Sequence, residues 1–170
     1  MRLSGDLDIE VLRKSLNEII RRHEVLRTTF VMGDDKAVQI IAPELDLNIE
    51  VVDLHSLPEE VRELEVHRHL TEEAQKPFDL AHGPLVRASL LSLGLTRSSG
   101  ITEYVMLFTL HHIVSDGWST AVLIREFITL YEAFSKDKTS PLPELPIQYA
   151  DYAVWQRKWL QGERLEQQLN

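Results

Sequence analysis

The segment of residues 103–112 constrains the fold of this chain more than any other. Side chains alternate between the two sides of a β-strand, and here both alternating sets are mainly apolar. The first set is Tyr104, Met106, Phe108, Leu110 and His112, and the second is Val105, Leu107, Thr109 and His111. A strand with two apolar sides needs a cover on each of them. We therefore expect residues 103–112 to form a central strand that is buried on both sides.

Helical and strand-like patterns alternate in the first third of the chain. Residues 9–30 place apolar side chains at helical spacing, behind Asp6 and Asp8, either of which can cap the helix. Residues 36–42 and 48–53 are short β-branched runs. We interpret these two runs as strands that pair in a hairpin with a long loop.

A further helix and a further strand precede the central strand. Ser56 and Glu59 have the spacing of a capping box, which predicts a helix from there to Gln75. Residues 84–93 are rich in apolar side chains and are predicted as a strand. The polar residues 96–100 are predicted as a turn.

The region after the central strand is predicted to be helical. A tight turn at 115–117 leads into an apolar helix over 118–134, and a proline-rich connection over 136–146 follows. A last helix is expected over 147–169, where one stripe holds Tyr152, Trp155 and Trp159. Such a stripe is more often a packing surface than a ligand site. The whole pattern predicts an α/β fold with a mixed sheet.

Composition excludes several classes of protein. With 27 acidic and 18 basic residues the net charge is −9, which disfavours a nucleic-acid partner. The absence of cysteine excludes disulfides, thiolate nucleophiles and Cys-ligated metals. The longest apolar stretch, residues 104–110, is far shorter than the roughly 20 residues of a membrane helix. We expect a cytoplasmic protein without a membrane partner.

One sequence motif has the composition of a catalytic site. The glycines match neither dinucleotide-binding nor P-loop spacing, and no Gly-x-Ser-x-Gly elbow is present. What remains is His111-His112-Ile-Val-Ser-Asp116-Gly117, between the central strand and a helix. Loops that follow buried strands are where α/β proteins place their sites.

The residues of this motif have more than one interpretation. Strand alternation sets the two histidines on opposite sides, so one serves chemistry and the other structure; an imidazole can accept a proton at neutral pH. Asp116 either caps the following helix or pairs with an arginine to hold the turn. Gly117 adopts a positive φ, leaves room for a substrate, or is an ordinary turn glycine. A metal site at His112 and Asp116 lacks a third ligand, so we expect no metal.

Three motifs together resemble those of condensation domains of nonribosomal peptide synthetases. They are residues 22–30 (RHEVLRTTF), 111–119 (HHIVSDGWS) and 149–156 (YADYAVWQ), in the order found in the family. The resemblance implies a chloramphenicol acetyltransferase-like half-domain, with a mixed sheet packed with helices. Residues 1–170 would form a partial condensation domain, the N-terminal subdomain without its first segment and without the C-terminal subdomain.

The resemblance also implies a reaction and partners. Condensation domains join an acyl or peptidyl thioester to an aminoacyl thioester through an amide bond, in the biosynthesis of secondary metabolites. Both substrates are carried on phosphopantetheine, and no cofactor is bound directly. The implied partners are upstream and downstream peptidyl carrier domains, the adenylation domain of the same synthetase and the C-terminal condensation subdomain.

The family's functional residues map onto this sequence. By resemblance, His112 is the catalytic histidine, His111 supports it, and Gly117 lies close to the reaction centre. Asp116 would hold the geometry of the site through an arginine.

Two arginines of the upstream motif are candidates to support the site. Arg22 matches the expected partner of Asp116 by motif position, and Arg27 is the second choice. Because they are five residues apart, they point to different sides of a helix, and the resemblance favours Arg22 as the inward one. His23 lies on the apolar stripe, so we expect a core histidine with satisfied hydrogen bonds.

Two other functions remain open. The chain could dock carrier or partner domains without catalysis, or act as a coenzyme A-dependent acyltransferase of the same superfamily. The isolated fragment is expected to be inactive, because one wall of the family's substrate tunnel would be absent.

Overall fold

A four-stranded mixed sheet forms the centre of the fold. The computed structural model describes residues 1–34, 36–95, 100–162 and 168. In spatial order the strands are β1 (Arg2–Ser4), β6 (Thr102–Leu110), β5 (Val86–Leu95) and β4 (Ile49–Asp53). β6 pairs antiparallel with β1 and β5, whereas β4 runs parallel to β5. β6 is therefore an inner strand, as predicted, and the mixed α/β class is confirmed.

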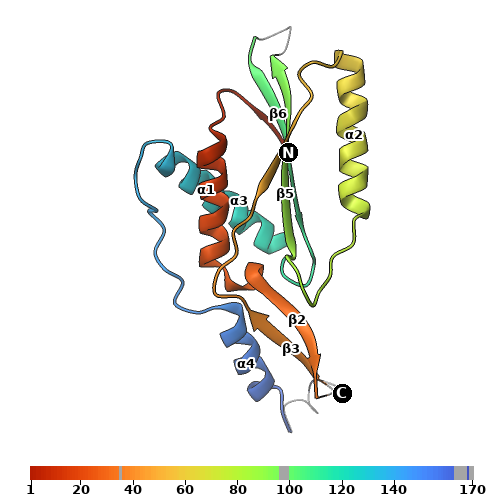
Figure 1. Cartoon of the computed structure of the whole chain (residues 1–170). Coiled ribbons are helices and arrows are strands. Elements are labelled where there is room, and N and C mark those ends of the chain that lie inside the picture. Colours follow the sequence, from red (N-terminus) through yellow and green to blue (C-terminus); the bar gives the residue numbers. More distant parts are fainter. Residues whose placement is uncertain (35, 96–99, 163–167, 169–170) are drawn as a thin grey trace.

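Helices cover both faces of this sheet (Figure 1). α1 (Ile9–Arg22) and α3 (Gly117–Phe134) lie on one face, and α2 (Glu59–Gln75) lies on the other. Met106 belongs to the apolar cluster under α1 and α3, whereas Val105 and Leu107 join the cluster of Val66 on α2. The prediction of a strand with two covered sides is confirmed.

A separate two-stranded sheet begins where the first helix was predicted to continue. Its strands are β2 (Thr28–Gly33) and β3 (Lys36–Ile41), which pair antiparallel. The helix predicted over 9–30 instead ends at Arg22, where the extended backbone of His23 closes it. A 3₁₀ turn, η1 (Glu24–Arg27), then leads into β2. The β-branched and aromatic residues of β2 prefer a strand, and this preference outweighs the helical spacing that continues through residue 26.

The pairing of the next strand was also predicted wrongly. The runs 36–42 and 48–53 do not form a hairpin, because β3 pairs with β2 while β4 pairs with β5. Both runs are strands, but their partners lie elsewhere along the chain. Antiparallel pairing of β3 with β2 needs only a short turn, whereas β4 pairs along one side with β5, at the edge of the larger sheet.

Helix boundaries follow capping chemistry with one exception. Asp8 caps α1, since its carboxylate accepts a hydrogen bond from the Val11 amide at 3.0 Å. The capping box predicted at Ser56 and Glu59 is absent: Pro58 is the N-cap of α2 and makes no side-chain capping bond. Pro58 shifts the helix start, so that Glu59 becomes its first residue and not its third.

The last helix is shorter than predicted. α4 (Tyr149–Trp159) ends before Gly162, which has a positive φ of 59°. Residues 163–167 and 169 of the predicted helix lie outside the described residues, and so do residues 96–99 of the turn predicted over 96–100. None of the helices in the described ranges is long and apolar enough to cross a membrane.

β5 contains a bulge at Gly94, which lies against the side chain of His55. The register of β5 against β6 shifts at Gly94, whose φ is +76° and whose added methyl group would overlap the His55 imidazole. Gly100 has a similar φ of +65° but open space around it. The left-handed backbone costs a non-glycine residue about 1–2 kcal/mol, and overpacking adds about 1–3 kcal/mol.

We therefore expect Gly94→Ala to lower the free energy of unfolding by about 2–4 kcal/mol and the control Gly100→Ala by about 1 kcal/mol. Urea denaturation of the full chain measures both. Equal losses at the two positions would contradict the close approach of His55 to β5.

Candidate active site

The histidine motif forms a turn at the end of β6. The strand ends at Leu110, and the His111 amide still donates to the Leu85 carbonyl at 3.0 Å. The chain then turns: the Val114 amide donates to the His111 carbonyl at 3.0 Å. Strand alternation therefore does not extend to the two histidines, and the turn decides their directions.

The two histidines have different surroundings. The His111 ring is half-buried and meets the ring of Phe78 at 86°, with centroids 5.7 Å apart. Its Nδ1 accepts a hydrogen bond from the Ile113 amide at 3.0 Å. The His112 side chain is exposed, and no described residue hydrogen-bonds its imidazole. Of the two histidines, His112 is thus the exposed one, whose ring has no hydrogen bond to a described residue.

Asp116 caps the helix that follows the turn. Its Oδ1 accepts hydrogen bonds from the Ser119 amide at 2.8 Å and from the Ser119 hydroxyl at 2.6 Å. The bond from the Ser119 hydroxyl, followed by those from backbone amides, lowers the pKa of Asp116 below its ordinary value. The capping interpretation is therefore confirmed. Among the residues that the structure describes, Asp116 pairs with no arginine: Ser119 bonds its carboxylate, and Arg22 and Arg27 bind other partners.

Gly117 is the first residue of α3 and does not have a positive φ. A methyl group at this position would meet no atom within 4 Å. Of the three alternatives for Gly117, the structure excludes a positive φ and shows open space beside the residue.

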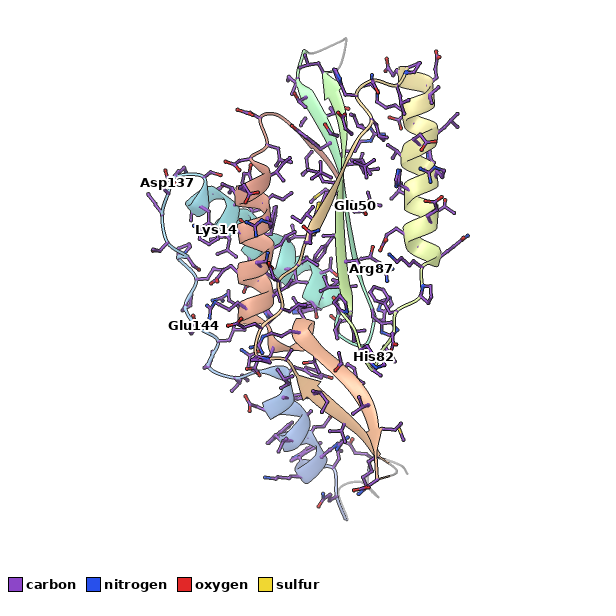
Figure 2. All side chains as sticks on the ribbon, viewed as in Figure 1. Lys14, Glu50, His82, Arg87, Asp137 and Glu144 are labelled. Atoms are coloured by element: carbon purple, nitrogen blue, oxygen red, sulfur yellow. The ribbon has the colours of Figure 1, made fainter. Side chains whose placement is uncertain are left out.

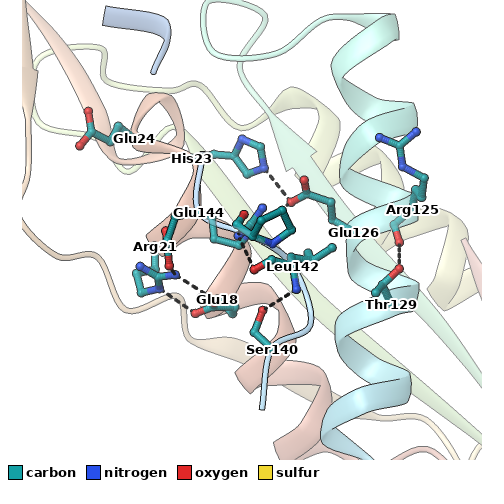
Figure 3. Close-up of polar contacts among 12 residues, drawn as sticks. Glu18, Arg21, His23, Glu24, Arg125, Glu126, Thr129, Ser140, Leu142 and Glu144 are labelled. Carbon is teal, nitrogen blue, oxygen red and sulfur yellow. Dashed lines mark hydrogen bonds and ion pairs between the residues drawn. The ribbon is translucent and has the colours of Figure 1, made fainter. Parts of the chain in front are cut away.

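Arg22 belongs to a buried ionic cluster between α1 and α3. Figure 3 shows one contact of this cluster, the one between His23 and Glu126. Its Nε lies 3.3 Å from Oε2 of Glu126, and its Nη1 donates to the Pro143 carbonyl at 2.8 Å. The same Oε2 lies 2.8 Å from Nε2 of His23. Arg22 therefore points inward, as expected, and its partner Glu126 also bonds Nε2 of the half-buried His23. Burial raises the pKa of Glu126, yet the hydrogen bonds from His23 and Arg22 outweigh it and lower that pKa overall.

Glu126 was not singled out from the sequence, although a signal was present. It lies three residues after Leu123 and four before Leu130, both of which are buried. Helical periodicity therefore places its carboxylate on the apolar stripe of α3, where a charge requires a partner.

Arg27 supports a different part of the fold. Its guanidinium donates to the Ala42 carbonyl and pairs with Glu24 at 3.4 Å. These contacts fasten η1 to the end of β3. Neither Arg22 nor Arg27 contacts Asp116, so any support that they give to the site is indirect.

A small pocket lies beside the histidine turn. It has a volume of about 150 Å³, and its lining includes His23, Val114 and Trp118. Trp118 is 86% exposed. Within the described ranges, no group of three His, Asp or Glu side chains is arranged to hold a metal ion.

The ionic cluster predicts unequal effects for two glutamates. Glu126→Ala leaves the buried guanidinium of Arg22 without its carboxylate, and we expect a loss of about 3 kcal/mol in the free energy of unfolding. Glu144 also pairs with an arginine, Arg21, but both side chains are largely exposed. Glu144→Ala should cost at most about 1 kcal/mol. Denaturant titration measures both losses. If Glu126→Ala cost less stability than Glu144→Ala, the buried cluster would not stabilise the fold as we propose.

The cluster also predicts a dependence on pH. Because the folded pKa of Glu126 lies below its ordinary value of 4.5, the ionised carboxylate stabilises the fold above that pH. This contribution is lost as the pH falls through the lower, folded pKa. The stability difference between the wild type and Glu126→Gln should therefore shrink below pH 4.5. Denaturant titration at several pH values measures this difference. A difference in unfolding free energy that stays constant below pH 4.5 would contradict the stabilising role of the ionised carboxylate.

Comparisons with known proteins identify the family. The family profile described as condensation domain matches residues 1–170. A subunit of linear gramicidin synthase from Brevibacillus parabrevis is 52% identical over 168 residues, which are 99% of this chain and 2% of that protein. Chondramide synthase cmdD of Chondromyces crocatus is 45% identical over 98% of this chain and 4% of its own length. The chain thus spans a few per cent of these curated relatives.

Solved structures agree with the fold. The X-domain from teicoplanin biosynthesis superposes with a TM-score of 0.81 at 29% identity, over 96% of this chain and 33% of that one. The starter condensation domain of rhizomide synthetase gives a TM-score of 0.77 at 19% identity, over 95% of this chain and 37% of its own, which shows a shared fold. From its sequence and its architecture, the chain belongs to the condensation domain family of nonribosomal peptide synthetases.

Proposed function

We propose that this chain supplies the histidine turn at which a condensation domain forms an amide bond. The amine of an aminoacyl thioester attacks the carbonyl carbon of an acyl or peptidyl thioester. A C–N bond forms, the C–S bond breaks, and the proton lost by the amine ends on the departing thiol or on solvent. The observation that carries this proposal is the exposed imidazole of His112, free of hydrogen bonds to described residues beside a histidine that is fixed.

The chemistry requires little beyond a proton acceptor and positioning. A thioester is a reactive acyl donor, so no enzyme nucleophile is needed, which suits a chain without cysteine. The attacking amine has to be neutral. His112 either accepts the proton of the amine or orients the amine while charge develops. A general base placed in this way contributes about 10²–10⁴-fold to a rate. Holding two tethered thioesters together supplies much of the remaining acceleration.

The neighbouring residues have supporting roles in this proposal. His111 fixes the turn, and Asp116 fixes the start of α3 through Ser119 in place of an arginine. Gly117 leaves space into which a thioester can enter without meeting a side chain.

Partners follow from the small share of the relatives that this chain covers. The substrates would arrive on phosphopantetheine arms of upstream and downstream peptidyl carrier domains, with an adenylation domain in the same synthetase. A C-terminal condensation subdomain would form the second wall of the site. The match to about a third of the solved relatives supports this arrangement. By itself the chain would then bind carriers without turnover.

Replacement of His112 tests the proposal. In a synthetase that carries this chain, with both carriers loaded, His112→Ala should lower the rate of amide formation by about 10²–10⁴-fold without loss of stability. Mass spectrometry of the product on the downstream carrier measures the rate. The matched control is His67→Ala, which removes an exposed histidine that lies on α2, outside the motif. An unchanged rate in His112→Ala would sink the proposed role.

A further inference from the structure

A chain of side-chain contacts links the C-terminal end of α2 to the histidine turn. It begins at Arg87 on β5, which lies between the sheet and the C-terminal end of α2 (Figure 2). The Arg87 Nε donates to the Glu73 carboxylate at 2.6 Å. Its other nitrogens donate to the carbonyls of Glu73, Lys76 and Pro77, at 3.2, 2.9 and 3.2 Å. These bonds satisfy carbonyls at the helix end and fix the plane of the guanidinium.

The fixed guanidinium positions an aromatic ring. Its central carbon lies 3.8 Å from the centroid of the Phe78 ring, in a cation–π arrangement. Phe78 in turn meets the His111 ring nearly at a right angle, which is a favourable geometry for two rings. Phe78 is therefore in contact with both Arg87 and His111.

The orientation of the His111 ring decides the path of the backbone that carries His112. The Nδ1 of His111 accepts the amide proton of Ile113, so the hydrogen bond spans His112. This bond requires an unprotonated Nδ1 that points forward along the chain, to the Ile113 amide. A ring free to rotate would lose the bond and release the backbone on either side of His112.

We propose that Phe78 and Arg87 are positioning residues, which act through His111 to hold the His112 imidazole in place. This inference rests on the proposed function of His112. Neither residue lies in the three sequence motifs. Arg87 is bonded to the C-terminal end of α2, whereas Phe78 packs against the apolar cluster under α1 and α3.

Substitutions that remove one contact at a time test the proposal in a synthetase that carries this chain. Phe78→Leu keeps the apolar bulk and removes the ring. Arg87→Lys keeps the charge and loses the planar fork of donors. Phe78→Tyr retains the ring and serves as the rescue. The control is Phe134→Leu, which removes a more deeply buried ring that also has a cation over it, Lys14 at 4.4 Å, but at the opposite end of α3.

Two measurements together separate positioning from general destabilisation. Hydrogen exchange followed by mass spectrometry reports on residues 111–115, where the amides of His111, Ile113 and Val114 are bonded. Steady-state kinetics separates kcat from the KM for the loaded carriers. We expect Phe78→Leu and Arg87→Lys to accelerate exchange in this segment and to lower kcat by about 10–100-fold, with KM unchanged. Phe78→Tyr should behave as the wild type, and Phe134→Leu should leave exchange at 111–115 unaltered.

The outcomes distinguish this proposal from the one on which it rests. Wild-type exchange or wild-type kcat in Phe78→Leu would overturn the positioning role, even if His112→Ala abolished turnover. If His112→Ala left the rate unchanged, the proposed function would fail while faster exchange in Phe78→Leu still demonstrated the contacts. Should Phe78→Leu fail to fold, Arg87→Lys decides, and unaltered exchange in that variant counts against the proposal.

Discussion

Because both faces of β6 are apolar, the sheet cannot leave either side in water, and the rest of the structure follows from that constraint. One face packs against α1 and α3, and the other packs against α2. The histidine turn follows the last residue of β6, at one end of the sheet. α3 begins directly after it, and the end of α2 reaches it through Arg87 and Phe78.

Charges inside the helical layer have a structural role that the motif alone does not indicate. A buried carboxylate on α3, that of Glu126, binds Arg22 and His23 at the end of α1. Arg22 also holds the carbonyl of Pro143, in the connection that leads to α4. A desolvated ion pair is weak evidence for stability, but it fixes position well, since its loss leaves an uncompensated charge. The upstream arginine motif thus orders α1, α3 and the connection relative to one another.

The proposed chemistry suits such a scaffold. An amine attacking a thioester needs no covalent intermediate with the enzyme, so the demands on the protein are one proton acceptor and accurate placement. In this proposal His112 serves the amine directly, whereas His111, Asp116 and Gly117 shape its surroundings. Placement by rigid neighbours is the part of catalysis that most depends on contacts far from the reacting atoms.

Local sequence patterns determined much of this protein: the two-sided strand at β6, the apolar helix after it, the caps at Asp8 and Asp116, and the family to which the motifs belong. These features depend on side-chain periodicity or on hydrogen bonds that span a few residues, and both are readable along the chain. Only the tertiary structure decided that β4 pairs with β5, that Arg22 binds Glu126 and not Asp116, and that Arg87 and Phe78 reach His111. Each of these joins segments far apart in sequence. Their partners are chosen by how the packed layers bring backbone and charge together, which no local pattern encodes.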